Sequence, residues 1–460
     1  MTSKYFVFII MAIIFVAGFS ILQAATLEVP GTYATIQAGI DAASNGDTVN
    51  VAAGNYNGYG NEDINTLGKA ILVKGVPDST GCGRFVINTG EDTTTVIKGL
   101  IISGTSANGG AVYIVGSSPK MENCLFGGRA WVGGSIYIDG GEPVIKNCSF
   151  VLAKANKGAA IYVEDGLLAL RQCFFFYNQA IDTFDLKWHY SGKGGALYAE
   201  NSQVTISNCD FQMCYAYSYR DTITEGARGG VLYLQNTVAI IDSSYFYSNR
   251  AEQYYKAAYG GTIYSTEGTT IAASHVSFDA SGGNVMGRAL YQEDSCEANF
   301  EYCYAKGFPP FISFYSEGNL DTIRVSCCNF DTLTWMYGAV GDWADTLDNF
   351  SAEPINCGGM NKSQSSYSPN LPQNNDCGER IGAIGETGDA NLDGEINLLD
   401  VLYLISYVYE YSGPPYTGYT GKSVFHFSKS VDCNGEVNLL DILCLMNHLY
   451  YDSCDLCDCD

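Results

Sequence analysis

Near the C-terminus, a twelve-residue pattern of oxygen-bearing side chains occurs twice. Loops that hold Ca²⁺ supply oxygen ligands from positions 1, 3, 5, 7 and 12, sometimes with a water at position 9, and need glycine at position 6. Gly394 and Gly435 occupy position 6 of the two copies. The pattern predicts two calcium sites, with Asp389, Asn391, Asp393, Glu395, Asn397 and Asp400 as ligands in the first copy and Ser430, Asp432, Asn434, Glu436, Asn438 and Asp441 in the second.

The two copies differ in their negative charge. Ser430 at position 1 and Asn434 at position 5 stand where the first copy has aspartates. Fewer carboxylates weaken the attraction for Ca²⁺. We therefore expect one strong site and one weaker site, the second depending on the first.

Each calcium loop is followed by a single apolar helix pattern, and no comparable helix precedes the first loop. Two loop-plus-helix halves with Asp at position 12 resemble the type I dockerin module over residues 386–453. The resemblance implies a cohesin-like protein partner, which would face Leu398-Leu399 and Leu439-Leu440. These symmetric apolar pairs could instead pack inside the module itself.

Three stretches in the middle of the chain combine aromatic rings with charged groups, at residues 182–190, 215–228 and 250–256. Aromatic platforms beside hydrogen-bonding charges suit sugar rings, which have apolar faces and hydroxyl edges. The aromatic residues could equally anchor the long loops to the body of the protein. The predicted glycan-binding residues are Trp188, Tyr190, Tyr217, Tyr219, Tyr254, Tyr255 and Lys256.

The same stretches contain groups that could cleave a polysaccharide. Hydrolysis needs two carboxylates, one of them protonated, whereas elimination from a uronic acid needs a base. No familiar signature of either reaction is present, so we predict a binding protein. A polysaccharide lyase or glycoside hydrolase is the alternative, and a non-catalytic structural adhesin is the second alternative. The candidate catalytic residues are Asp182 or Asp185 together with Asp221 as the acid pair, Arg220, Arg228 or Arg250 as a lyase base, and His189.

A repeat must position these stretches. The run Gly-Gly-small-aliphatic-Tyr recurs from Gly109 to Tyr291, first at intervals of 24 and 25 residues. A Cys lies eleven residues after the Tyr, and a Phe follows two residues later, so both share one face of a strand. A unit this short cannot bury its own apolar face and must stack on its neighbours. The Cys column comprises Cys124, Cys148, Cys173 and Cys209, which we expect to be reduced and buried.

The repeat resembles the right-handed parallel β-helix of the pectate-lyase-like class. Residues 33–43 would form a short helix that caps the coil, followed by a strand at residues 47–51. Three successive repeats lengthen at the same corner, so we expect them to stand side by side as one rim. The fold prediction is an all-β solenoid, a right-handed parallel β-helix over residues 25–350, followed by a closing segment at 351–385 and the small α-helical dockerin-like module at 386–453.

The remaining cysteines fall near the C-terminus. Cys357 and Cys377 resemble the closing segment of such β-helices, and the resemblance implies that they pair. In similar calcium modules, cysteines at the positions of Cys433 and Cys454 form a clasp. The acidic tail at residues 454–460 could instead bind a soft metal through Cys454, Cys457 and Cys459.

The N-terminus and the net charge bear on location and partners. Residues 1–24 carry a lysine and then an apolar run, which is typical of a secretory signal peptide cleaved near Ala24. We expect a secreted, extracellular or cell-surface protein with no membrane span after cleavage. The net charge of −25 makes nucleic acid an improbable partner. Calcium and a polysaccharide or cell-surface glycan are compatible with it.

Overall fold

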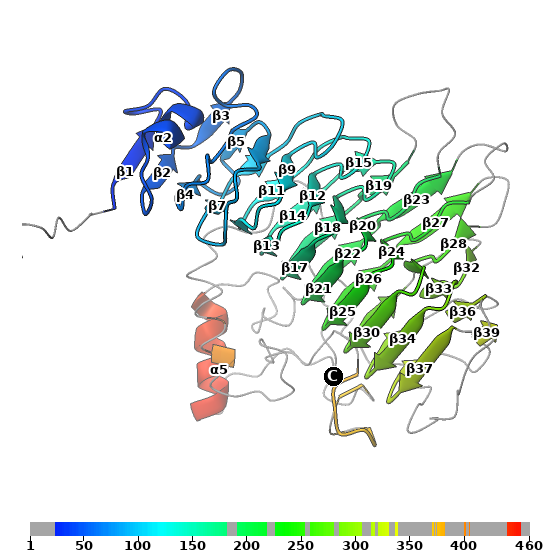
Figure 1. Cartoon of the computed structure of the whole chain (residues 1–460). Helices are drawn as coiled ribbons and strands as arrows, with labels where there is room; N and C mark the ends of the chain where they lie inside the picture. Colours follow the sequence, from blue (N-terminus) through cyan, green and yellow to red (C-terminus); the bar gives the residue numbers. More distant parts are fainter. Residues whose placement is uncertain are drawn as a thin grey trace, which may run out of the picture.

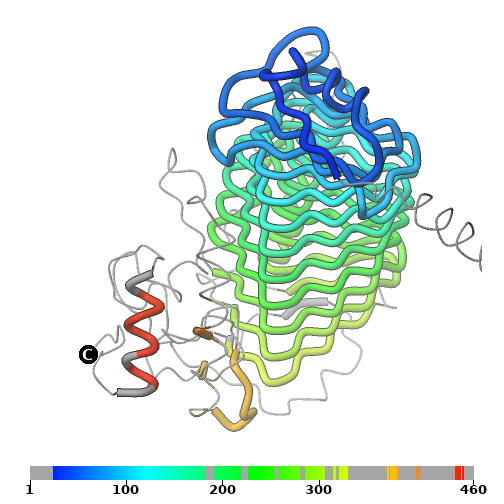
Figure 2. The backbone as a smooth tube through the Cα atoms, turned by 90° about the vertical axis from the view of Figure 1, so that its left-hand side faces the viewer, coloured from blue at the N-terminus to red at the C-terminus, as the bar shows by residue number. Residues whose placement is uncertain are grey.

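Parallel strands stacked rung upon rung form the body of the protein (Figure 1). This computed structural model describes residues 24–181, 191–218, 226–253, 258–279, 285–305, 314–317, 321–330 and 336–338. Beyond these it describes residues 370–371, 373, 375–381, 400–401, 404 and 439–451. Figure 2 shows the regular rise of the coil from its N-terminal rung. Within the described residues, no helix is long and apolar enough to span a membrane.

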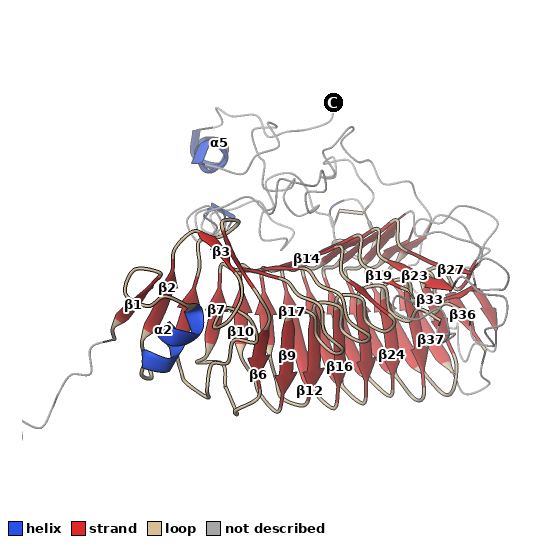
Figure 3. Cartoon of the chain, turned by 90° about the horizontal axis from the view of Figure 1, so that it is seen from above, coloured by secondary structure: helices blue, strands red, loops and turns tan. Residues whose placement is uncertain are grey.

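Three long parallel sheets, A, B and C, make the walls of the coil, and from β4 onward each described rung adds one strand to each wall (Figure 3). Sheet A contains β1 (Thr26–Val29), β2 (Thr48–Val51), β4 (Leu72–Lys74), β7 (Val96–Lys98), β10 (Lys120–Glu122), β13 (Val144–Lys146), β17 (Leu167–Arg171), β21 (Gln203–Ser207), β25 (Val238–Asp242), β30 (Thr270–Ser274), β34 (Glu297–Glu301) and β37 (Thr322–Ser326). Sheet B contains β3 (Gly54–Tyr56), β5 (Thr80–Cys82), β8 (Ile101–Ile102), β11 (Leu125–Phe126), β14 (Ser149–Val151), β18 (Phe174–Phe176), β22 (Asp210–Gln212), β26 (Tyr245–Tyr247), β31 (Ser277–Asp279), β35 (Tyr304–Ala305) and β38 (Asn329–Phe330).

Sheet C and two short sheets complete the rungs. Sheet C contains β6 (Phe85–Ile87), β9 (Val112–Val115), β12 (Ile136–Asp139), β16 (Ile161–Glu164), β20 (Leu197–Glu200), β24 (Leu232–Gln235), β29 (Ile263–Thr266), β33 (Leu290–Gln292), β36 (Phe314–Ser316) and β39 (Met336–Gly338). Sheet D contains β15 (Lys154–Ala155), β19 (Gln179–Ala180), β23 (Tyr215–Ser218) and β27 (Arg250–Gln253), and sheet E contains β28 (Ala258–Tyr259) and β32 (Val285–Met286).

The N-terminal end is closed by the expected short helix, α2 (Ile36–Ala42). The Thr35 hydroxyl accepts a hydrogen bond from the backbone N–H of Ala38, which caps the first turn. Ile36 and Ile40 are fully buried. The helix therefore packs its apolar side against the first two strands, β1 and β2.

A single residue with positive φ makes the turn from sheet A to sheet B. Asn123 has a φ of 53° and Asn147 a φ of 60°, a conformation that Asn tolerates better than most residues. Nδ2 of Asn147 donates to Oδ1 of Asn123 at 2.7 Å. The two asparagines thus form a side-chain hydrogen bond between adjacent rungs at this turn.

The two glycines of the Gly-Gly pair are each required for a different reason. At Gly133, φ is 59°, and a Cβ would lie 2.2 Å from the carbonyl oxygen of Ile136. At Gly134, a Cβ would lie 2.2 Å from the carbonyl oxygen of Ala159, in the next rung. The first glycine therefore permits a left-handed turn, and the second permits close approach of neighbouring backbones.

The core is built from columns of identical side chains. Phe175 and Phe211 stack with ring centroids 4.5 Å apart, as part of a continuous phenylalanine column. The predicted Cys column is confirmed, because Cys124, Cys148, Cys173 and Cys209 are free and buried. The backbone N–H of Cys124 lies 3.4 Å from Sγ of Cys148. The column resumes near the C-terminal end with Cys303 and Cys328, which sequence analysis did not assign to it.

Buried asparagines lie three residues after two phenylalanines of the column, in Phe175-x-x-Asn178 and Phe246-x-x-Asn249. Oδ1 of Asn178 accepts from the backbone N–H of Ala153 at 3.0 Å, and its Nδ2 donates to the carbonyl oxygen of Phe150 at 3.0 Å. Asn249 makes the same two bonds with Cys214 and Phe211. These side chains satisfy backbone groups of the preceding rung that would otherwise be unpaired in the core.

The disulfide expected between Cys357 and Cys377 was predicted wrongly, because Cys377 pairs with Cys327 across a Cα separation of 5.8 Å. Cys327 occupies the positive-φ turn position between sheets A and B, which directs its side chain out of the coil. The closing segment reaches this turn, since Nδ2 of Asn329 donates to Oδ1 of Asn370. Cys357 lies outside the described residues.

The Cys column yields a prediction about thiol reactivity. Burial raises the pKa of Cys148 well above its ordinary value and keeps it protonated. A thiol reagent applied to the native protein should leave all four predicted column cysteines unmodified, and all four should react after denaturation. Peptide mapping by mass spectrometry would locate the labelled residues. Rapid native labelling of any one of them would contradict the inward register.

Candidate functional site

The predicted rim lies at the corner between sheets B and C, where the strands of sheet D are inserted. Strand β19 pairs with β23, and β23 pairs with β27, so the three lengthened corners are stacked in successive rungs as expected. Tyr217, Arg228 and Arg250 are the candidate site residues of the rim that the structure describes. The others lie outside the described residues, namely Asp182, Asp185, Trp188, His189, Tyr190, Tyr219, Arg220, Asp221, Tyr254, Tyr255 and Lys256.

The described base of the rim is an aromatic and charged cluster on sheet D. Tyr215 is opposite Arg250, and Tyr217 is opposite Glu252. The Arg250 guanidinium lies 4.8 Å from the centroid of the Tyr215 ring and 3.4 Å from the Glu252 carboxylate. We call these four residues the sheet D cluster. It combines ring faces with a cation and an anion held in a fixed arrangement.

Tyr217 in this cluster is held in its neutral form. Burial raises the pKa of Tyr217 to about 12, and the Glu252 carboxylate adds to the rise, while Arg250 opposes it. At neutral pH the phenol is therefore a hydrogen-bond donor as well as an acceptor. A donor beside a carboxylate can orient a hydroxyl-rich ligand.

A tyrosine ladder covers the outer face of sheet C. In the repeat, Tyr follows the inward aliphatic residue and so points outward. Adjacent rings are nearly parallel, with Tyr198 and Tyr233 4.6 Å apart at an interplanar angle of 5°. Sequence analysis used this tyrosine only as a marker of the repeat. The ladder consists of Tyr113, Tyr137, Tyr162, Tyr198, Tyr233, Tyr264, Tyr291 and Tyr315.

Cations cover the ladder along the side next to the rim. Nζ of Lys157 lies 4.6 Å from the Tyr198 ring centroid, and Nζ of Lys193 lies 5.2 Å from that of Tyr233. Lys157, Lys193 and Arg228 occupy one column, each just before the first glycine of its repeat. The middle rings are almost fully buried under this cover. They therefore pack the face rather than offering free rings to a ligand.

Carboxylates line the other side of the ladder. The Tyr162 hydroxyl lies 3.2 Å from both Glu164 and Glu200. Further along, Tyr264 donates to Glu293, and Tyr291 donates to Glu317. The signal for this arrangement was visible in the sequence as an acidic residue two positions after the Tyr, which places both side chains on the same face of a strand.

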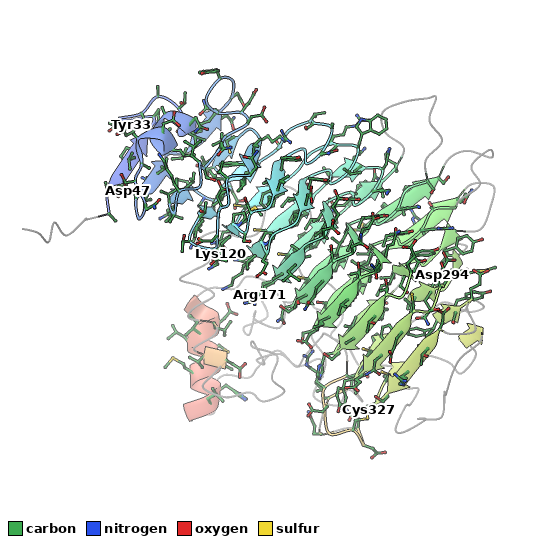
Figure 4. The ribbon with its side chains drawn as sticks, in the orientation of Figure 1. Tyr33, Asp47, Lys120, Arg171, Asp294 and Cys327 are labelled. Atoms are coloured by element: carbon green, nitrogen blue, oxygen red, sulfur yellow. A yellow bond between two sulfur atoms is a disulfide. The ribbon has the colours of Figure 1, made fainter. Side chains whose placement is uncertain are left out.

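Arg228 and Glu293 meet at the C-terminal half of this face. The Arg228 guanidinium lies 5.0 Å from the Tyr264 ring centroid, and its Nη1 is 4.0 Å from Oε1 of Glu293. Burial raises the pKa of Glu293; the Tyr264 hydrogen bond and the Arg228 charge oppose the rise, whereas the charges of Asp294 and Glu317 add to it. Asp294 lies on this side of the coil (Figure 4).

The two calcium loops are described only at their ends. Asp400 and Asp441, at position 12 of each loop, are fully buried. Asp441 lies in the first turn of α5 (Leu439–Tyr451), and Ile442 and Leu445 of the same helix are buried. Cys444 takes part in a disulfide that sequence analysis did not anticipate. The other predicted ligands, and Cys433 and Cys454, lie outside the described residues, and no group of three potential metal ligands occurs within them.

The raised pKa of Tyr217 gives a prediction on pH. Neutral Tyr217 is favoured in the folded state, so its contribution to stability is complete below the ordinary tyrosine pKa of about 10 and is lost as the pH rises towards about 12. Tyr217→Phe should therefore reduce the loss of stability between these pH values. Denaturant unfolding at several pH values would measure it. Equal pH dependence of parent and variant would contradict the burial of this phenol.

Comparison with known proteins bears on the fold. A search of curated proteins finds no match. A solved structure, the catalytic unit of the thermostable GH87 alpha-1,3-glucanase from Streptomyces thermodiastaticus strain HF3-3, aligns at 11% identity over 72% of this chain and 67% of its own. Its TM-score of 0.21 is too low to support any argument. Residues 60–211 match the family model described as the right handed beta helix region, so the stacked parallel strands form a right-handed β-helix.

Proposed function

We propose that this is a secreted, calcium-binding protein whose β-helix presents a polysaccharide-binding face at the rim. The sheet D cluster is the observation that carries the proposal. In it, Tyr215 and Tyr217 lie beside Arg250 and Glu252, directly before the lengthened loops. Tyr215 is buried under Arg250, whereas the Tyr217 ring is half-exposed, and a ring next to paired charges suits the apolar faces and hydroxyl edges of sugars. The C-terminal module would then dock the protein to a cell-surface or complex partner.

The buried carboxylates of the module support the calcium proposal. Asp400 and Asp441 are both fully buried, at position 12 of the two predicted loops, where each loop joins its helix. Ca²⁺ bound there would tie each loop to the helix that follows. The oxygen-rich donor set of the first loop fits Ca²⁺ better than a softer metal.

Removal of Asp389 and Asp400 by alanine substitution tests the calcium proposal. Metal binding is coupled to folding in small domains, so the double variant should lose the calcium-dependent order of the module while the β-helix stays folded. Circular dichroism with calcium and with a chelator would follow the helical signal. Asp452→Ala, outside both loops, is the control. A module equally ordered with and without calcium would overturn the proposal.

Substitution of rim aromatics tests the glycan proposal. Trp188→Ala with Tyr219→Ala should abolish retention on a polysaccharide array and leave the melting temperature almost unchanged. Tyr59→Ala is a matched control, since Tyr59 is fully exposed near the N-terminal end. If the aromatics only anchor the loops, the double variant should instead lose several kcal/mol, about 3 to 5 for each buried ring. No glycan would then bind the parent protein.

Hydrolysis is the second candidate function, favoured by one observation. Glu293 has a raised pKa, and Glu317 follows it on the same face, one rung away. Two carboxylates in different environments are the groups that glycoside hydrolysis uses. Under our proposal the protein retains polysaccharide without releasing reducing ends. Release that is lost in Glu293→Gln and kept in Glu301→Gln would establish a hydrolase instead.

A further inference from the structure

A row of cations crosses the outer face of sheet A in the N-terminal half of the coil. Successive residues of a strand point to opposite faces. Burial alternates along β4, β7, β10, β13 and β17: every second residue is buried, and the residues between are exposed or half-exposed on the outer face. The cations of the exposed set, which we call the basic row, are Lys74, Lys98, Lys120, Lys146 and Arg171.

In-register pairing makes the row straight. Lys74 is opposite Lys98, and Lys146 is opposite Arg171. Glu122 is the residue between these pairs, opposite both Lys98 and Lys146. Adjacent strands lie about 4.8 Å apart, so Lys74, Lys98, Lys146 and Arg171 follow one another along the coil axis. Lys120 lies in the neighbouring column, opposite Val96 and Val144. Lys120 and Arg171 lie along the same edge of the coil in Figure 4.

The row is electropositive in a strongly acidic protein. On the outer face of these five strands Glu122 is the only carboxylate, so five cations less one anion leave a local charge of +4. Glu122 lies 2.6 Å from Lys120 and 3.6 Å from Lys98. Lys74 and Arg171 form no ion pair with any described residue. The whole chain carries −25, so the net charge of the protein opposes the approach of an anionic ligand.

The sign of the face reverses farther along the same sheet. Asp242, Glu297 and Glu301 point outward from β25 and β34, and Arg324 is the one cation on the outer face of the described strands from β21 to β37. An extended anion would therefore be held over the N-terminal strands and would not be attracted farther along the face.

The residues around the cations are suited to sugar. Val96 and Val144 share the outer face with the row and are half-exposed, which provides an apolar floor. Asn123 and Asn147 follow the last residues of β10 and β13 directly, so their amides border the row. Cations, apolar surface and amides together match a chain of rings that carries carboxylates and hydroxyls.

We propose that the basic row binds a single extended chain of an acidic polysaccharide, of the polyuronate class, lying along the coil axis. This site is separate from the rim, because the row is on sheet A and the rim is at the corner between sheets B and C. A narrow straight row fits one chain. A nucleic acid duplex or an anionic membrane is broader than one such row, and a long one would also meet the acidic residues farther along sheet A.

Binding of the full-length mature protein to polygalacturonate, compared with its methyl ester, tests the proposal. The ester has the same backbone without the charges, so it should bind at least about tenfold more weakly. The triple substitution Lys74→Gln, Lys146→Gln and Arg171→Gln should weaken binding of polygalacturonate by about the same factor, and raising the salt from about 0.05 to about 0.3 M should weaken binding by the parent. Biolayer interferometry would measure the affinities.

Two controls make the result decisive. Arg324→Gln removes a cation from the other end of the same face and should leave binding unchanged. Keeping the charges with Lys74→Arg, Lys146→Arg and Arg171→Lys should restore affinity. Equal binding of the ester, or no loss in the triple variant, would overturn the proposal. So would tighter binding of duplex DNA or anionic phospholipid vesicles through the same residues.

Discussion

Zero-shift pairing between rungs is the constraint on which the rest of the structure depends. Each strand pairs in parallel with its counterpart in the next rung, so every side chain lies directly beside the equivalent side chain of its neighbours. A residue type is stable at a given position only if it is compatible with copies of itself about 4.8 Å away. Phenyl rings meet this condition by stacking, and thiols meet it by packing as small apolar groups.

The same constraint governs the charges on the outer faces. Carboxylates in adjacent rungs repel, and on sheet C the tyrosine ladder relieves this by placing a hydroxyl between Glu164 and Glu200. On the opposite side of the ladder, the ammonium groups of Lys157 and Lys193 lie over the faces of the Tyr198 and Tyr233 rings and make cation-π contacts. Sheet C therefore carries two columns of opposite sign, separated by neutral phenols with raised pKa values.

The repeat explains what could be predicted from the sequence. The fixed spacing from Tyr to Cys gave the register of the core, because a column shows itself as a periodic residue. The pairing of Cys377 with Cys327 could not be read in this way, since it depends on where a non-repetitive segment meets the last rungs. The contents of the rim are likewise non-periodic. The tyrosine ladder was missed although the Tyr-x-acid spacing was present, because burial through mutual stacking has no signature in a single repeat.

Some residues destabilise the stack when the neighbouring rungs carry the same residue type. Where such residues recur, binding of a ligand explains the sequence better than stability of the fold does. Leu72, Val96 and Val144 show that the outer face of sheet A accepts apolar residues. Cations in neighbouring rungs repel, and Lys74 and Arg171 gain no compensating pair among the described residues. Polar neutral residues would stabilise the stacking of the rungs at least as well. The next strand, β21, already has two such residues, Thr205 and Ser207, on this face. The row of like charges is therefore best explained by an opposite charge that lies outside the chain.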